Sequence, residues 1–106
     1  MKVIYVAGKY TSSSEWGLYQ NIHHAREVAH RLWDEGWAVI CPHSNTSFFG
    51  GEYANHHIDR EIWIKGDLEI LSRCDAIYML NNWQKSRGAI DELKLAEELG
   101  LEVYYE

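Results

Sequence analysis

Residues 75–99 read DAIYMLNNWQKSRGAIDELKLAEEL and contain a strand pattern followed by a helix pattern. The run from Asp75 to Leu80 has the length and apolar content of a buried strand. After a polar stretch, apolar residues from Ala89 to Leu99 recur at helical spacing, and Gly100 ends the predicted helix. A buried strand that leads into an amphipathic helix is the repeating unit of a parallel α/β sheet.

The same alternation extends over the whole chain. Strands are predicted at residues 2–8, 37–41, 75–80 and 101–105, and helices at residues 18–35, 59–73 and 89–99. Because strands that alternate with helices form parallel sheets with right-handed crossovers, we predict a small doubly wound parallel sheet, Rossmann-like or flavodoxin-like, with four to five strands and helices on both faces. No linker or repeat interrupts the pattern, so we expect residues 1–106 to form a single domain.

The composition is that of a globular protein and limits the partners of the chain. Hydrophobic residues make up 46% of the sequence and charged residues 25%. The formal net charge of −6 argues against a nucleic-acid polymer or an anionic membrane as partner, because both bind basic surfaces, but a small nucleotide stays compatible with it. Cys41 and Cys74 lie in or beside apolar runs, which favours free thiols over a disulfide framework. With no recognisable signal peptide or membrane span, the chain is expected to be cytoplasmic.

The junction between the third strand and the last helix is the strongest candidate for a site. Ser86 and Gly88 come shortly before Glu92. Backbone N–H groups at the start of a helix can bind an anion, and a glycine lets a ligand approach the backbone. Ligands of open α/β sheets bind at the carboxyl ends of the strands, where this junction is expected. Glu92 is therefore a candidate nucleophile or general base.

Two other loops are expected at the same edge of the sheet. Gly8 and Lys9 follow the first strand and could receive a ribose or a phosphate, although an ordinary polar loop is an equal reading and no dinucleotide or Walker motif is present. His43 follows the second strand, so we predict a role in base or phosphate recognition. Aromatic residues of the three loops could stack on a nucleobase or simply pack within the protein: Tyr10, Phe48, Phe49 and Trp83.

Two aspartates are candidates for a second carboxylate. Asp67 lies late in the predicted second helix and Asp75 begins the third strand, and both positions are also ordinary for structural or solvated aspartates. If Asp67 faces the ligand edge, it pairs with Glu92, and two carboxylates around one scissile bond are what glycosyl transfer requires.

The histidines give no metal-binding pattern. They lack an accompanying cysteine or carboxylate at a recognised ligand spacing, so we expect no metal site and no cofactor. They are His23, His24, His30, His43, His56 and His57.

These motifs together resemble the nucleoside 2-deoxyribosyltransferase superfamily, which includes 2′-deoxynucleoside 5′-phosphate N-hydrolases and small phage-type relatives. The resemblance covers nearly the whole chain and rests on residues 5–8 (YVAG), 67–75 (DLEILSRCD) and 86–93 (SRGAIDEL). It implies that Glu92 is the nucleophile, that Asp67 protonates the leaving base and that Ser86 contacts a 5′-phosphate. One departure is Ile90, which stands where the family usually has a second glycine. The substrate-binding residues expected from the motifs and the resemblance are Tyr5, Gly8, Lys9, Tyr10, His43, Asp75, Trp83, Ser86 and Gly88.

The expected function is cleavage or transfer at the N-glycosidic bond of a (deoxy)nucleoside or its 5′-monophosphate. Two other classes stay open, namely a nucleotide-binding sensor or sequestering protein on the same fold and a phage-type interaction protein whose aromatic loops bind a protein partner. The 5 Trp and 7 Tyr are many to bury in 106 residues, and the resemblance implies pockets that are completed across subunits. A homo-oligomer is therefore expected.

Overall fold

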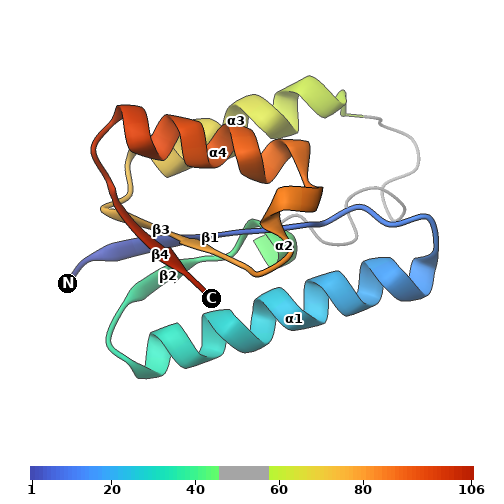
Figure 1. Cartoon of the computed structure of the whole chain (residues 1–106), viewed down its shortest axis with the longest axis horizontal. Coiled ribbons are helices and arrows are strands. Elements are labelled where there is room, and N and C mark those ends of the chain that lie inside the picture. Colours follow the sequence, from blue (N-terminus) through green and yellow to red (C-terminus); the bar gives the residue numbers. More distant parts are fainter. Residues whose placement is uncertain (46–57) are drawn as a thin grey trace.

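The computed structural model describes residues 1–45 and 58–106 and shows strands and helices in alternation (Figure 1). The strands are β1 (Val3–Ala7), β2 (Ala38–Ile40), β3 (Ala76–Met79) and β4 (Glu102–Tyr105). The helices are α1 (Glu15–Asp34), α2 (Pro42–Asn45), α3 (Arg60–Ser72) and α4 (Arg87–Glu98), with a short 3-10 helix, η1 (Trp83–Lys85), before α4. Some of the residues named in the sequence analysis lie outside the described residues: Phe48, Phe49, His56 and His57.

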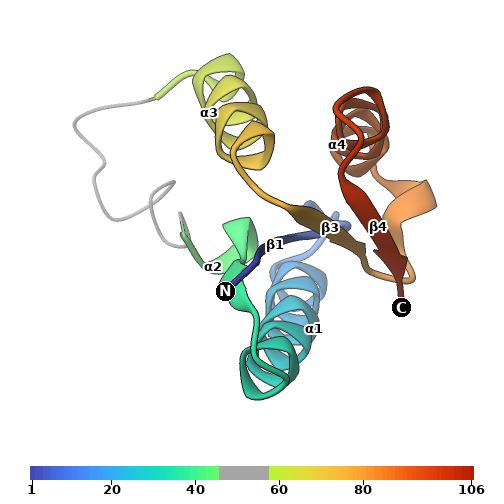
Figure 2. The same cartoon turned by 90° about the vertical axis from the view of Figure 1, so that its left-hand side faces the viewer.

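The strands form one sheet in the order β2-β1-β3-β4, and every pairing is parallel. Helix α1 covers one face of the sheet, while α3 and α4 lie side by side on the other (Figures 1 and 2). This arrangement confirms the predicted doubly wound, flavodoxin-like α/β fold with four strands. Strand β2 pairs with one edge of β1 and β3 pairs with the other edge, so the order of the strands reverses between them. The carboxyl ends of β1 and β3 therefore form the switch point at which such folds bind ligands.

Side chains of β1 alternate between the two faces and build a core on each. Ile4 and Val6 pack with the cluster under α1, whereas Tyr5 and Ala7 pack with the cluster under α3 and α4. Tyr5 is completely buried (0% exposed). A tyrosine at such a position needs a hydrogen-bond partner for its hydroxyl.

Two helices begin earlier than the hydrophobic pattern predicts, because a capping serine sets the first turn. Ser14 Oγ accepts a hydrogen bond from the backbone N–H three residues on (3.0 Å), so α1 begins at Glu15 and not at residue 18. Ser86 Oγ does the same for α4 (3.1 Å), which begins at Arg87 and not at residue 89. The chain after β2 turns into the short helix α2, where a loop was expected.

The cysteines are free, as predicted. Cys41 is half-buried and Cys74 is buried, and burial raises the pKa of both thiols. In the part of the chain that the structure describes, no helix has the length and apolarity of a bilayer-spanning segment.

Candidate active site

A tyrosine of β1 and a glutamate of α4 meet above the sheet. Helix α4 starts near the carboxyl ends of the strands and runs back over them, so Glu92, five residues from Arg87, lies about 7.5 Å along the helix. Tyr5, two residues before Ala7, lies about 6.6 Å from the end of β1. The two residues are therefore at similar depth, and the Tyr5 hydroxyl donates a hydrogen bond to Glu92 Oε2.

Burial changes the acidity of both partners. The pKa of Glu92 is raised to about 7, mainly by burial; the charges of Asp67 and Asp91 add to the rise, and the hydrogen bond from Tyr5 opposes it. Burial and the charges of Glu92 and Asp67 raise the pKa of Tyr5 well above its ordinary value, so Tyr5 stays a neutral donor. A carboxyl group whose pKa lies near neutrality is suited to take part in chemistry at pH 7.

The second carboxylate comes from the neighbouring helix. Asp67 lies on α3, which packs beside α4 (Figure 2). Its charge acts on both Glu92 and Tyr5, so Asp67 lies within the range of electrostatic interaction with this pair. Burial raises the pKa of the Asp67 carboxyl above its usual range. The pair of carboxylates anticipated from the sequence is thus brought together on the α3 and α4 face of the sheet.

The loops after β1 and β3 are fixed to one another at the switch point. The Lys9 N–H donates to Asn82 Oδ1 (2.9 Å), and the Leu80 N–H donates to the Ala7 carbonyl (2.8 Å). A Cβ atom on Gly8 would come within 2.5 Å of Leu80 Cδ1 and 2.9 Å of Asn82 Oδ1. Close packing of the two loops therefore requires a glycine at this position, whether or not a ligand approaches it.

The sequence reasoning missed Asn82. The only signal was its place, in a pair of asparagines directly after the third strand at the expected ligand edge. Its side chain joins the loops after β1 and β3, so it positions the backbone of Lys9.

His43 is almost completely buried (4% exposed) and lies against the loop after β1. Its Nε2 is 2.9 Å from the Lys9 carbonyl oxygen, and because a carbonyl only accepts, this nitrogen carries the proton. Burial lowers the pKa of His43, so the ring is neutral and Nδ1 presents a lone pair. That nitrogen is buried without a hydrogen-bond partner among the described residues, and the ring stacks on Tyr10 (5.7 Å between centroids). A neutral acceptor of this kind favours recognition of an N–H or O–H group over recognition of a phosphate.

The residues between β3 and α4 have structural roles of their own. The Ser86 hydroxyl caps α4, and Gly88 is exposed, with no atom closer than Ser86 Oγ (3.9 Å) to the place where a Cβ would be. The start of α4 is therefore open on that side. Trp83 packs toward Tyr105 of β4, with ring centroids 6.1 Å apart.

Asp75 is not brought to the ligand edge. It precedes β3 and so lies at the amino ends of the strands, where its Oδ2 accepts a hydrogen bond from the Val3 N–H (2.8 Å). This contact joins the starts of β1 and β3, which is a structural role, at the opposite end of the strands from the loops after β1 and β3.

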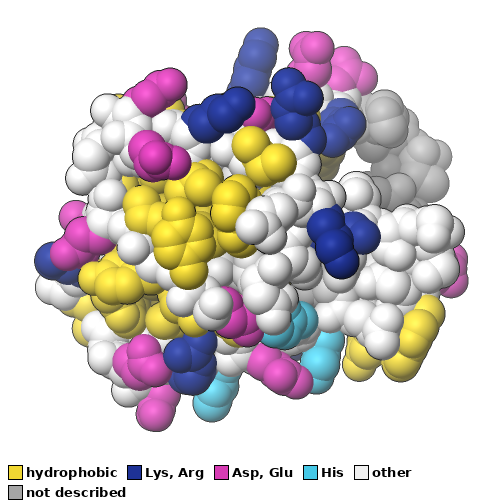
Figure 3. All heavy atoms as spheres, in the orientation of Figure 1, with side chains coloured by type: hydrophobic (Ala, Val, Ile, Leu, Met, Phe, Trp, Pro, Cys, Tyr) yellow, Lys and Arg dark blue, Asp and Glu magenta, His cyan; other side chains and the backbone are white. Residues whose placement is uncertain are grey.

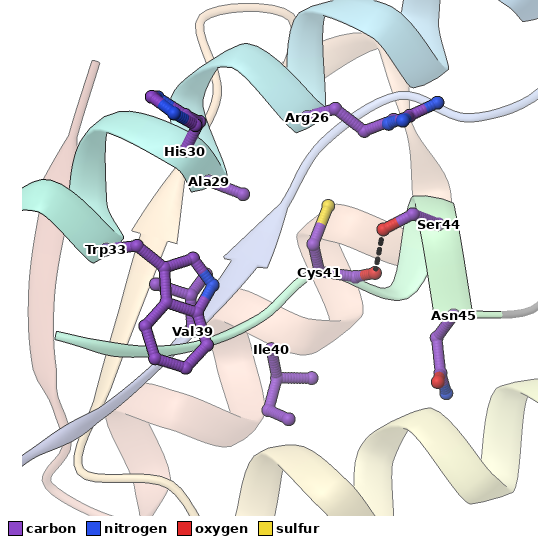
Figure 4. Close-up of a pocket in the computed structure, with 9 residues that line it drawn as sticks. All are labelled: Arg26, Ala29, His30, Trp33, Val39, Ile40, Cys41, Ser44 and Asn45. Atoms are coloured by element: carbon purple, nitrogen blue, oxygen red, sulfur yellow. Dashed lines mark hydrogen bonds between the residues drawn. The ribbon is translucent and has the colours of Figure 1, made fainter.

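The cavity in Figure 4 is separate from the carboxylate cluster. It has a volume of about 470 Å³ and lies between α1 and the edge strand β2. None of the predicted catalytic residues lines it. Within residues 1–45 and 58–106, no group of three His, Cys, Asp or Glu side chains is arranged to hold a metal ion.

Comparison with solved structures finds the same fold in two deoxyribosyltransferases. The 2-desoxiribosyltransferase from Leishmania mexicana superposes with a TM-score of 0.68 at 17% identity, over 99% of this chain and 63% of that one. The 2-deoxyribosyltransferase from the psychrotolerant bacterium Bacillus psychrosaccharolyticus gives a TM-score of 0.65 at 24% identity, over 97% of this chain and 70% of that one. The chain is thus structurally similar to 2-deoxyribosyltransferases over nearly its whole length, and at these identities the likeness shows the fold.

The sequence itself gives a family but no activity. No curated protein matches it significantly. Residues 2–105 match the family described as a domain of unknown function, DUF4406. Because that match spans almost every residue, the chain belongs to the DUF4406 family.

Proposed function

We propose that this protein cleaves or transfers at the N-glycosidic bond of a (deoxy)nucleoside or its 5′-monophosphate. The observation that carries the proposal is the group formed by buried Tyr5 and half-buried Asp67 and Glu92, in which the pKa of Glu92 is raised to about 7. Two carboxyl groups with raised pKa values on one face of a doubly wound sheet are suited to glycosyl chemistry. The fold shared with 2-deoxyribosyltransferases supports the same reading.

In the first step, Glu92 is the nucleophile. Tyr5 holds Oε2, so Oε1 attacks C1′ from the face opposite the base. The new C1′–O bond forms as the C1′–N bond breaks, and the bonding electron pair leaves with the base. In the reacting state the two carboxyl groups share one proton, which lies on Asp67 while Glu92 is ionised. Asp67 delivers this proton to the departing base nitrogen, which prevents the build-up of negative charge there.

In the second step, the glycosyl ester is opened. A water molecule attacks C1′, gives a proton to the Asp67 carboxylate and releases Glu92, which completes hydrolysis. If a second base attacks instead, its N–H proton goes to Asp67 and the reaction is a transfer. Both routes restore the starting protonation of the two carboxyl groups.

The test is release of free base from a panel of nucleosides and 5′-monophosphates, followed by chromatography. Glu92→Gln keeps the shape and the acceptor for Tyr5 but cannot form the ester, so we expect base release to fall by at least about 10³-fold while ligand binding persists. Glu98→Gln, at an exposed position of the same helix, is the matched control and should react like the parent protein.

Two results would overturn the proposal. Base release by Glu92→Gln at near the parental rate would remove Glu92 as nucleophile. Tight binding of a nucleotide by the parent protein without any turnover would make the fold a nucleotide-binding module instead of an enzyme.

A further inference from the structure

Helix α1 carries a continuous row of exposed aromatic and basic side chains. They are spaced alternately three and four residues apart, and we call them the α1 stripe: Trp16, Tyr19, His23, Arg26, His30 and Trp33. Spacing of this kind places side chains in one line along a helix. Tyr19 stacks between Trp16 (5.5 Å) and His23 (6.0 Å), which holds the amino-terminal half of the stripe in order.

The stripe is not part of the core. The buried residues of α1 lie on a different face: Ala25, Val28, Ala29 and Leu32. Trp16, Tyr19 and Trp33 are 66%, 57% and 55% exposed. Figure 3 shows histidine side chains along the α1 edge and hydrophobic side chains near its amino-terminal end. Large aromatic side chains left in solvent in such a row mark an interaction surface.

The α1 stripe is nearly symmetric about a point between His24 and Ala25. Trp16 and Trp33 are equally distant from this midpoint, and so are Tyr19 and His30, and His23 and Arg26. We propose that the α1 stripe is the interface of a homodimer in which the α1 helices of two copies pack antiparallel about a twofold axis at this midpoint. A twofold axis brings each position opposite its mirror position in the second copy, so this symmetry lets every residue of the stripe meet another residue of the stripe.

The cavity beside α1 fits the same arrangement. Arg26, His30 and Trp33 project from successive turns of α1 and line the cavity, whose apolar wall includes Val39 and Ile40 (Figure 4). In the antiparallel pair, Trp16 of the second copy comes level with Trp33, and Tyr19 of the second copy comes level with His30. The aromatic residues of each copy therefore face the cavity of the other, and aromatic anchors seated in pockets dominate interface energies.

The charges near the proposed axis are compatible with self-association. His23 and Glu27 already pair within one chain (2.7 Å). Two copies bring two such pairs together, and Glu27 of one copy comes beside His23 of the other. A nucleic-acid strand is the poorer occupant, because Glu15 and Glu27 flank the stripe and the chain carries a net charge of −6.

The surface is large enough for a dimer. A stable interface buries about 800 Å² on each partner. A fully buried aromatic side chain removes about 150–250 Å² from water. Because the three aromatic side chains of the stripe are 55–66% exposed, they supply roughly a third to a half of this area, and the other side chains of the stripe and the cavity wall supply the remainder. This inference does not depend on the proposed function.

Sedimentation velocity on the full chain tests the proposal. We expect a species of about twice the 12.4 kDa chain mass at micromolar concentration. Trp16→Ser should weaken dimerisation by at least about 100-fold, because both symmetric anchors are lost. Tyr105→Ser is the matched control, since Tyr105 is similarly exposed (57%) but lies on β4 and not on the α1 stripe, and should leave the dimer intact.

A second variant tests the proposed interface by changing a charge and removes no aromatic side chain. Glu27→Lys places a cation beside His23 and Arg26 of the second copy and should also weaken the dimer, whereas Glu98→Lys on α4 should not.

A parent protein that is monomeric up to about 100 μM would overturn the proposal. Loss of the dimer in Tyr105→Ser together with its persistence in Trp16→Ser would overturn it as well, and would move the interface to β4. Circular dichroism confirms that each variant is folded.

Discussion

At the scale of single residues, the ionisation of Glu92 is controlled by neighbours that act in opposite directions. Burial and the charge of Asp67 raise the pKa of Glu92, and the hydrogen bond from Tyr5 lowers it. The two carboxyl groups together lose their last proton as the pH rises through about 7, the pKa of Glu92. Because Asp67 needs that proton to protonate the leaving base, the proposed reaction should slow above this pH.

Substitution of these neighbours should move that pH dependence in opposite directions. Tyr5→Phe removes a stabilising donor and should raise the pKa of Glu92, whereas Asp67→Asn removes a like charge and should lower it. A direct titration of the Glu92 carboxyl by NMR measures both changes, and the basic limb of kcat/KM reports the change in Tyr5→Phe. Asp91→Asn is the control, because Asp91 acts on Glu92 less than Asp67 does and should give a smaller fall. A shift of the same sign for Tyr5→Phe and Asp67→Asn would contradict this account.

The sequence predicted some residues of the site but not how they contact one another. Glu92 and Asp67 can be proposed from the sequence because their motifs are local. The bond between Tyr5 and Glu92 depends on how far α4 extends back over β1, which no local pattern encodes. Asn82 was missed for the same reason, since its partner Lys9 is distant in the sequence.

At the scale of elements, the hydrophobic periodicity predicted the four strands and three long helices of the described residues, but it placed the starts of α1 and α4 too late. Ser14 and Ser86 are polar and carry no periodic signal, yet each satisfies a backbone N–H that would otherwise be unpaired. A hydrophobic pattern shows which residues face the core, and capping side chains determine where a helix begins.

These two caps provide a matched test of phosphate recognition. Loss of either hydroxyl should cost about 1 kcal/mol of stability, so Ser14→Ala and Ser86→Ala should both lower the Tm. If the Ser86 hydroxyl also donates its hydrogen to a 5′-phosphate, Ser86→Ala should raise KM for the monophosphate by about tenfold and leave the nucleoside nearly unchanged. Ser14→Ala should change neither KM. Equal effects of Ser86→Ala on both substrates would restrict this residue to capping.

At the scale of the whole molecule, alternation of strands and helices was enough to predict a doubly wound sheet, because the handedness of crossovers leaves few other topologies. The order β2-β1-β3-β4 then fixes which strand ends meet. Asp75 shows the consequence: it belongs to β3, but at the amino end, so the topology separates it from Asp67 and Glu92. The cavity under the α1 stripe was not anticipated, since it arises from the distance between α1 and β2 and not from a motif.

The free energy of unfolding should depend on pH through the ionisation of Glu92. Its pKa rises from 4.5 to about 7 on folding. A carboxyl group whose pKa is raised in the folded state stabilises that state fully below the unfolded pKa, and this contribution is lost as the pH rises through the folded pKa. The loss between pH 4 and pH 8 is on the order of 3 kcal/mol.

Glu92→Gln should remove this pH dependence, because the amide keeps the contact with Tyr5 but never ionises. We expect the variant to be more stable than the parent protein at pH 8 and nearly equal to it at pH 4, as measured by urea denaturation at both values. Glu98→Gln, exposed on the same helix, should show no such difference.

A stabilisation by Glu92→Gln that is equal at both pH values would mean that Glu92 is not held at a raised pKa, and the carboxylate cluster would lose its basis as a catalytic site. A larger difference than Glu92 alone supplies would implicate Asp67, whose pKa is raised by burial as well, and Asp67→Asn measured in the same way would separate the two contributions.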